Sequence, residues 1–147
     1  NKGGSVNDRD EEGRTPLHFA CFGVAPSGAS SLVPVLVNAG AQVDARDHEG
    51  RTPLIVACRS SDVSAARLLL SHHADVNSRS DSGWTGLMYA ARSGHVKLIE
   101  LLIQHGAVLN IKNSDGLTAA MIAEKYQRVD ALRILRRFEK EISEKRR

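Results

Sequence analysis

The sequence is short of aromatic residues, long apolar runs and catalytic motifs, and each shortage excludes a class of protein. One Trp, two Tyr and three Phe in 147 residues give no series of rings on which the bases of single-stranded nucleic acid would stack. No apolar run approaches the roughly 18 residues expected of a membrane span. Nucleic acid is therefore an unexpected partner, and no membrane span is expected.

Motifs for catalysis and for metal binding are missing as well. The sequence contains no nucleophile–base pair, phosphate loop or paired-acid motif. The six histidines form no spaced ligand cluster with carboxylates or thiols. The acidic run at 7–12 fits a calcium loop only in part. We therefore expect no enzyme activity, no cofactor and no metal.

What the sequence does contain is a segment that occurs four times. The copies cover residues 13–20, 50–57, 83–90 and 116–123, and their leading glycines are separated by 37, 33 and 33 residues. A period of this size is typical of a stacked repeat array, in which each unit is too small to bury its own apolar face.

The start and the end of each unit resemble the ankyrin-repeat family. The first unit contains Thr15-Pro16-Leu17-His18, and the second and third close with the similar stretches 68–77 and 101–110. The resemblance covers nearly the whole chain. It implies an all-α repeat solenoid of stacked helix-turn-helix units with β-hairpin loops, and a family role in protein–protein interaction.

Local sequence signals predict where the helices begin and end. Thr15 and Thr52 can accept hydrogen bonds from the first helical amides, and a proline follows each at the first helical position. These first helices should run to about residues 23, 60, 93 and 126. Gly40 and Gly106 stand where a positive φ is wanted, a place that His73 takes in the second unit.

Aligning the units divides the chain into one domain, 1–147. We expect 1–7 to be the end of an upstream repeat, 8–44 a repeat with a four-residue insertion, 45–77 and 78–110 regular repeats, and 111–147 a C-terminal capping repeat with an extended basic helix. The chain is thus expected to be a fragment of a longer protein. The insertion lies near Pro26 and is read as a tolerated loop or, alternatively, as a binding loop. Pro34 should fall in the first turn of a helix that starts late, near Ser30 or Ser31.

The two cysteines, Cys21 and Cys58, occupy the same position in successive units. Stacked helices lie ~8–10 Å apart, beyond the ~7 Å limit for a disulfide. Both thiols should therefore be reduced, which favours an intracellular protein, cytoplasmic or nuclear.

Basic residues recur at the positions where the ankyrin family binds partners, on loop tips and first helices. The resemblance therefore implies a partner-binding groove, and its candidate residues are Arg9, Arg14, Arg46, Arg51, Arg59, Arg79, Trp84, Arg92, Lys112 and Lys125. Residues 136–147 hold six basic and three acidic residues, which accounts for the whole net charge of +3. The rest of the chain is neutral, so basic residues are sorted onto these positions. The alternative is that the loop arginines are solvated and paired with acids of the same loops.

We expect the groove to bind an acidic or amphipathic peptide with an apolar anchor that meets Trp84. Trp84 could instead pack within the loop layer. A second hypothesis is binding of nucleic acid or anionic lipid through the groove and the basic C-terminal helix. Asn77 resembles the asparagine that ankyrin-directed hydroxylases modify and is a candidate hydroxylation site.

Overall fold

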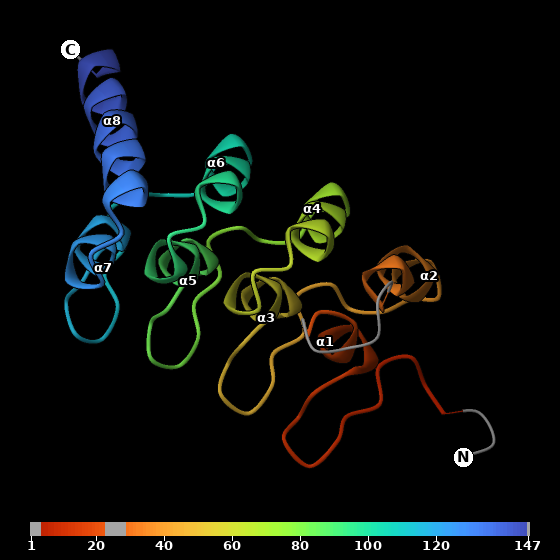
Figure 1. The fold of residues 1–147 in the computed structure, drawn as a ribbon. Helices are drawn as coiled ribbons and strands as arrows, with labels where there is room; N and C mark the ends of the chain where they lie inside the picture. Colours follow the sequence, from red (N-terminus) through yellow and green to blue (C-terminus); the bar gives the residue numbers. More distant parts are fainter. Residues whose placement is uncertain (1–3, 23–28, 147) are drawn as a thin grey trace.

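The structure is a computed structural model that describes residues 4–22 and 29–146. Its helices follow each other in pairs, an inner helix and then an outer one (Figure 1). The inner helices are α1 (Pro16–Ala20), α3 (Pro53–Arg59), α5 (Gly86–Ser93) and α7 (Ala119–Lys125). The outer helices are α2 (Leu32–Asn38, preceded by the short 3-10 helix η1, Ala29–Ser31), α4 (Val63–Ser71), α6 (Val96–Gln104) and α8 (Val129–Lys145). The predicted all-α solenoid is confirmed.

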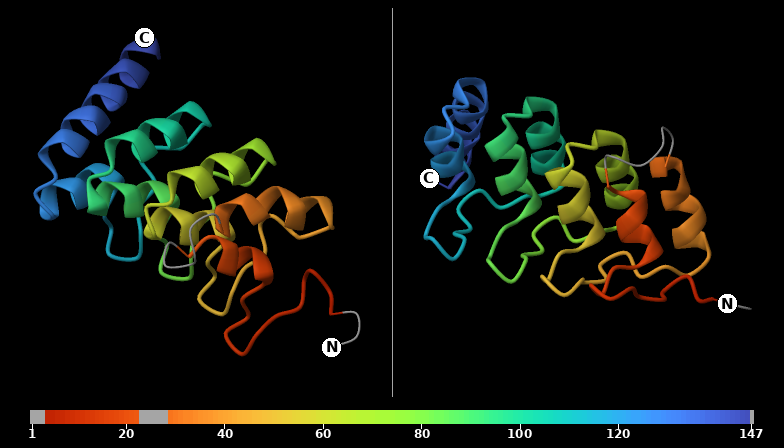
Figure 2. Two further views of the ribbon diagram at one scale, coloured as in Figure 1. Left: turned by 45° about the vertical axis from the view of Figure 1, so that its right-hand side comes forward. Right: turned by 60° about the horizontal axis from the view of Figure 1, so that its bottom comes forward.

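The two sets of helices form two layers, and the loops before the inner helices all project from the same side (Figures 1 and 2). These loops, called the first to the fourth below, cover residues 8–15, 45–52, 78–85 and 111–118. Each turns back through a pair of backbone hydrogen bonds. In the second loop Asp47 N–H donates to Arg51 O at 3.0 Å and Gly50 N–H donates to Asp47 O at 2.9 Å. Because this ladder is only one pair long, the predicted β-hairpins do not form strands within the described residues.

A threonine precedes each inner helix; at Thr15 the backbone N–H donates to His18 Nδ1 at 3.0 Å, and the predicted side-chain cap is found at Thr52. Thr52 accepts a hydrogen bond from Ile55 N–H, and Thr85 and Thr118 do the same in the next two units. Pro16 and Pro53 occupy the first helical turn, where the missing N–H costs nothing. The inner helices end within three residues of the predicted positions.

The turns and the late helix of the first unit also follow the prediction. Gly40 and Gly106 have φ of +98° and +92°, and His73 takes the same left-handed conformation with φ of +67°. Pro34 lies in the first turn of α2, which begins at Leu32. The insertion near Pro26 lies outside the described residues.

The core runs along the array between the two layers. Every residue of α3 except Arg59 is buried, and Leu69, Leu102 and Leu135 of the outer helices are buried against the inner layer. Cys21 and Cys58 are buried and unbridged, as predicted. Burial raises the pKa of Cys21 to about 12 and also raises the pKa of Cys58. Both thiols therefore stay protonated and act as small apolar core groups.

The last outer helix differs from the others because no residue with a positive φ, such as Gly40, His73 or Gly106, ends it at the equivalent place. α8 continues to Lys145 and extends beyond the neighbouring helices (Figure 2). Its mean hydropathy is low, and no helix in the described part of the chain is long and apolar enough to cross a membrane. The predicted extension of this helix is confirmed.

Candidate functional site

The four loops share one turn, built around a side chain at the same position of each unit. Asp47 Oδ1 accepts hydrogen bonds from the backbone N–H groups of Glu49 and Arg51, both at 2.9 Å. Asp10 makes the same pair of bonds in the first loop, and Asn113 makes them in the fourth. In the third loop Ser80 accepts from Trp84 N–H at 3.2 Å. The polar side chain therefore fixes the loop in every unit.

Two of the candidate arginines are partners of these turn residues. Arg14 Nε donates to Asp10 at 2.8 Å, and Arg51 Nε donates to Asp47 at 3.1 Å. Each arginine also forms an ion pair with a second acid of its loop, Glu12 or Glu49. The pairing with loop acids, which the sequence left open, is the arrangement found for Arg14 and Arg51.

The sequences of the third and fourth loops support the pairing of the arginine with the turn aspartate. Where the arginine is replaced by Trp84 or Leu117, the turn aspartate is replaced by Ser80 or Asn113. Acid and base thus change together between units. The first two loops are held by charge, whereas the last two present apolar side chains.

A second group of arginines links each loop to the next one. Arg9 donates to the carbonyl of Gly13 in its own loop and to that of Arg46 in the following loop. Arg46 repeats this with Gly50 at 3.0 Å and with Arg79 O. Arg79 donates to Lys112 O at 2.8 Å. These guanidinium groups bind backbone carbonyls and so tie successive units together.

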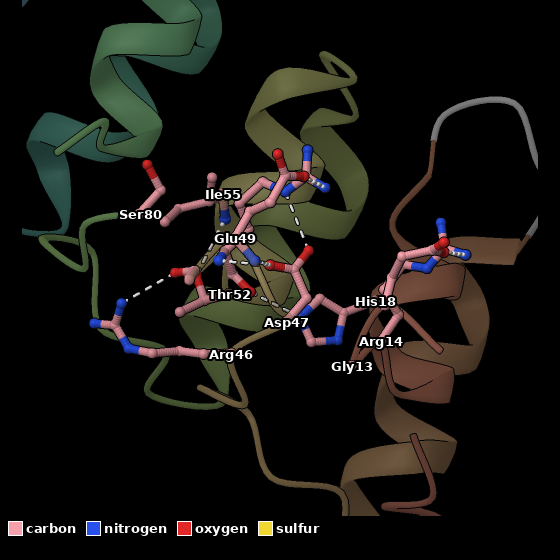
Figure 3. Close-up of polar contacts among 12 residues, drawn as sticks. Gly13, Arg14, His18, Arg46, Asp47, Glu49, Thr52, Ile55 and Ser80 are labelled. Carbon is pink, nitrogen blue, oxygen red and sulfur yellow. Dashed lines mark hydrogen bonds and ion pairs between the residues drawn. The ribbon is translucent and has the colours of Figure 1, made fainter. Parts of the chain in front are cut away.

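The second loop also receives a side chain from the first unit (Figure 3). His18 Nδ1 accepts from Thr15 N–H at 3.0 Å, and Nε2 lies 2.8 Å from Arg51 O. Because a carbonyl can only accept, the proton must be on Nε2. Burial lowers the pKa of His18, which keeps the ring neutral. His18 therefore has a structural role, and no group of three metal-ligating side chains occurs in the part of the chain that the structure describes.

The remaining candidates lie at the ends of the inner helices and differ from the loop arginines. Arg59, Arg92 and Lys125 are exposed. None of the three forms an ion pair with an acid among residues 4–22 and 29–146. We call these three residues the helix-end cations. Lys112, at the end of the linking series in the fourth loop, is exposed as well.

Aromatic rings surround the central helix-end cation. The guanidinium of Arg92 lies 6.0 Å from the Trp84 ring and 5.7 Å from the Tyr126 ring. Trp84 and Tyr89 contact each other with ring centroids 4.7 Å apart. Trp84 is half-buried against the core, so it both packs within the loop layer and borders this surface. Cation–π contacts of this kind hold a cation in place without neutralising it.

A pocket of about 430 Å³ opens between these side chains. We call it the Tyr–Arg pocket, and its lining residues are Arg59, Tyr89, Arg92, Ser93, Tyr126 and Arg128. Tyr126 and Arg128 were not among the predicted site residues. A sequence signal for Arg128 was available, because it stands where Asp62 and His95 cap the outer helices of the preceding units.

Asn77, the candidate hydroxylation site, bridges two units. Its Nδ2 donates to Gly106 O at 3.2 Å and its Oδ1 accepts from Val108 N–H at 2.8 Å. Asn7 makes the equivalent bonds to Gly40 and Gln42 one junction earlier. Asn77 is half-buried, and both polar atoms of its side-chain amide take part in this junction.

Comparisons with known proteins agree with this architecture. The sequence profile of the family described as ankyrin repeats (3 copies) matches residues 2–80 and 72–146. A search of curated proteins gives no significant match. Taken together with the paired helices, the period and the threonine caps, the profile match shows that the chain belongs to the ankyrin-repeat family.

Proposed function

We propose that this chain is a non-enzymatic interaction module that binds an acidic or amphipathic segment of a partner protein. Ankyrin repeats are generally protein–protein interaction modules and typically non-enzymatic scaffolds. The observation that carries the finer proposal is the set of helix-end cations without acidic partners in the described structure, beside Trp84 and Tyr89. A carboxylate-bearing segment would supply the missing charge, and an apolar anchor would meet the rings.

The proposal gives the candidate residues two different roles. Arg59, Arg92, Lys125 and Trp84 remain binding residues, and Lys112 is an exposed cation at the edge of the same region. Arg9, Arg14, Arg46, Arg51 and Arg79 position the loops, because their guanidinium groups already bind carbonyls or carboxylates. We further propose a reducing compartment, cytoplasmic or nuclear, since both thiols are buried and unbridged.

Selection from a random peptide display library tests the proposal. The wild-type chain should enrich peptides with several Asp or Glu residues next to an aromatic or aliphatic residue. The triple variant Arg59→Gln, Arg92→Gln, Lys125→Gln should lose this enrichment. The matched control, Arg67→Gln, Lys97→Gln, Lys140→Gln, removes three exposed charges from the outer helices and should keep it. Identical peptide pools from the wild type and the triple variant would contradict the proposal.

Salt dependence and Trp84 distinguish this function from binding of nucleic acid or anionic lipid. Affinity for a selected peptide should fall gently with salt, whereas phosphate-backbone binding falls steeply. Trp84→Leu copies the residue of the fourth loop and should weaken peptide binding at least tenfold while the chain stays folded. A steep salt slope with no effect of Trp84→Leu would favour the alternative function.

A further inference from the structure

We propose that the Tyr–Arg pocket binds a phosphorylated side chain of the partner protein. This inference rests on the proposed function and adds the chemistry of the anchoring group. The pocket is formed where the ends of α3, α5 and α7 meet the turn that leads into α8. Two of the three helix-end cations, Arg59 and Arg92, therefore line it.

The lining of the pocket is rich in hydrogen-bond donors and poor in acceptors. Three of its six residues are arginines, two are tyrosines and none is an aspartate or glutamate. Arginine has no acceptor and cannot be deprotonated in a protein, and the tyrosine hydroxyls can donate as well. Ser93 already donates its hydroxyl proton to Ala90 O at 3.1 Å. Such a lining matches a ligand that carries several acceptor oxygens and negative charge.

Arg128 is held toward the pocket by the local backbone. Its Nε donates to Arg92 O at 2.9 Å, which leaves its terminal amino groups for a ligand. A β-carbon on Gly94 would lie 3.0 Å from Arg128 Cδ, so the arginine side chain packs closely over this glycine on its way to the end of α5. In the two preceding units Asp62 and His95 cap the next helix instead. In the fourth unit the residue at this position, Arg128, does not cap α8 with its side chain and instead extends to the end of α5 in the preceding unit.

Arg92 is positioned as well, by its contacts with the Trp84 and Tyr126 rings. The C-terminal ends of α5 and α7 favour cations through the helix dipole. This explains how several arginines can gather here before any anion binds. A guanidinium fixed in advance loses less conformational entropy when it binds a ligand.

Charge and geometry favour a phosphoryl group over a single carboxylate. A phosphorylated side chain carries about −1.5 to −2 charges and three acceptor oxygens, and arginine clusters are a recurring means of recognising it. A lone carboxylate offers two oxygens and one charge, which leaves most of the three guanidinium groups unmatched. The two tyrosines add ring surface beside the anion, on which the ring of a phosphotyrosine can stack.

Small phosphate and carboxylate compounds test phosphate binding separately from the proposed peptide binding, because they require no selected peptide. In titrations followed by ¹H–¹⁵N NMR, phenyl phosphate should shift the Nε–H signals of Arg59, Arg92 and Arg128 saturably. Its affinity should be at least tenfold higher than that of benzoate. Methyl phosphate shows which phosphorylated residue fits, since binding equal to phenyl phosphate assigns phosphoserine or phosphothreonine, and weaker binding assigns phosphotyrosine.

Variants provide the control and the contrary outcomes. Arg92→Gln with Arg128→Gln should abolish the shifts, whereas Arg133→Gln with Arg137→Gln on α8 should leave them unchanged. Equal binding of phenyl phosphate and benzoate would overturn the inference, as would shifts that persist in the first variant. Binding to phosphoinositide vesicles without a saturable response to either phosphate monoester would also overturn it. If acidic peptides are selected but phenyl phosphate does not bind, the proposed function stands and only the preference for phosphate is contradicted.

Discussion

The loop arginines and the helix-end cations recur with the same period, yet the structure uses them differently. Arg46 and Arg51 of the second loop bind carbonyls and carboxylates within the array. Arg59, at the end of α3 in the same unit, has no acidic partner in the described residues. A repeated basic residue is therefore a weak sign of a binding site by itself. A stronger sign of a binding site is a basic side chain for which the described structure provides no acidic partner.

The strongest test of this contrast is the removal of the acid that holds a loop arginine. Asp47 is buried, and Asp47→Ala would leave the backbone N–H groups of Glu49 and Arg51 without their acceptor. It would also leave the Arg51 guanidinium with only the exposed carboxylate of Glu49. We expect a loss of about 3 kcal/mol in the free energy of unfolding, measured by urea denaturation. Glu49→Ala removes a carboxylate whose side chain is 70% exposed and should cost less than about 0.5 kcal/mol.

A double variant sharpens the same test. Asp47→Asn with Arg51→Leu copies the pair found in the fourth loop, Asn113 and Leu117. Because the amide oxygen can accept the same two backbone bonds, most of the stability should return. If Asp47→Ala is no worse than Glu49→Ala, the loop arginines are not held by this buried acid and the contrast with the helix ends fails.

A smaller effect is expected from two arginines of one unit that are both exposed. Arg46→Ala removes two hydrogen bonds to carbonyls of successive loops and should destabilise the chain by roughly 1–2 kcal/mol. Arg59→Ala should change stability by less than about 0.5 kcal/mol but should reduce peptide binding. Thermal melting and binding to one selected peptide measure the two effects. Equal melting shifts for the two variants would remove the distinction.

The fold was readable from the sequence because its signals are local and repeated. The threonine caps, Gly40, Gly106 and the late start at Pro34 each act within one or two turns of helix. The predicted β-hairpins are not found as strands in the described residues, because one pair of backbone hydrogen bonds is enough to turn each loop.

The candidate site was only partly readable, because it depends on which side chains meet across units. The series Arg9, Arg46 and Arg79 gives no hint in sequence that each guanidinium reaches a carbonyl 33 or 37 residues further on. The link between Asp47 and Arg51 was visible, since both residues change together in later units. Tyr126 and Arg128 join the pocket through contacts with Arg92 of the preceding unit, a cation–π contact for Tyr126 and a hydrogen bond to the Arg92 carbonyl for Arg128.

The smallest expected effect concerns pH and the junction between the first two units. Only the first unit has a histidine at the position of His18. The equivalent residues of the next three units are Ile55, Met88 and Met121. Since burial lowers the pKa of His18, the unfolded chain takes up a proton at higher pH than the folded chain. The contribution of neutral His18 to the free energy of unfolding is therefore complete above the ordinary histidine pKa of about 6.5. It is lost as the pH falls toward the lowered pKa of His18 in the folded chain.

Hydrogen exchange at pH 7 and at pH 5.5 should locate this loss. We expect α1 and the second loop to lose protection at the lower pH more than the junction of α5 with α7, where no histidine is buried among the described residues. His18→Gln should remove the difference between the two pH values while lowering protection at both. His105→Gln, which changes an exposed histidine, should leave the difference in place. An equal loss along the whole array would mean that protonation acts through the overall charge and that the His18 contact to Arg51 has no separate part in it.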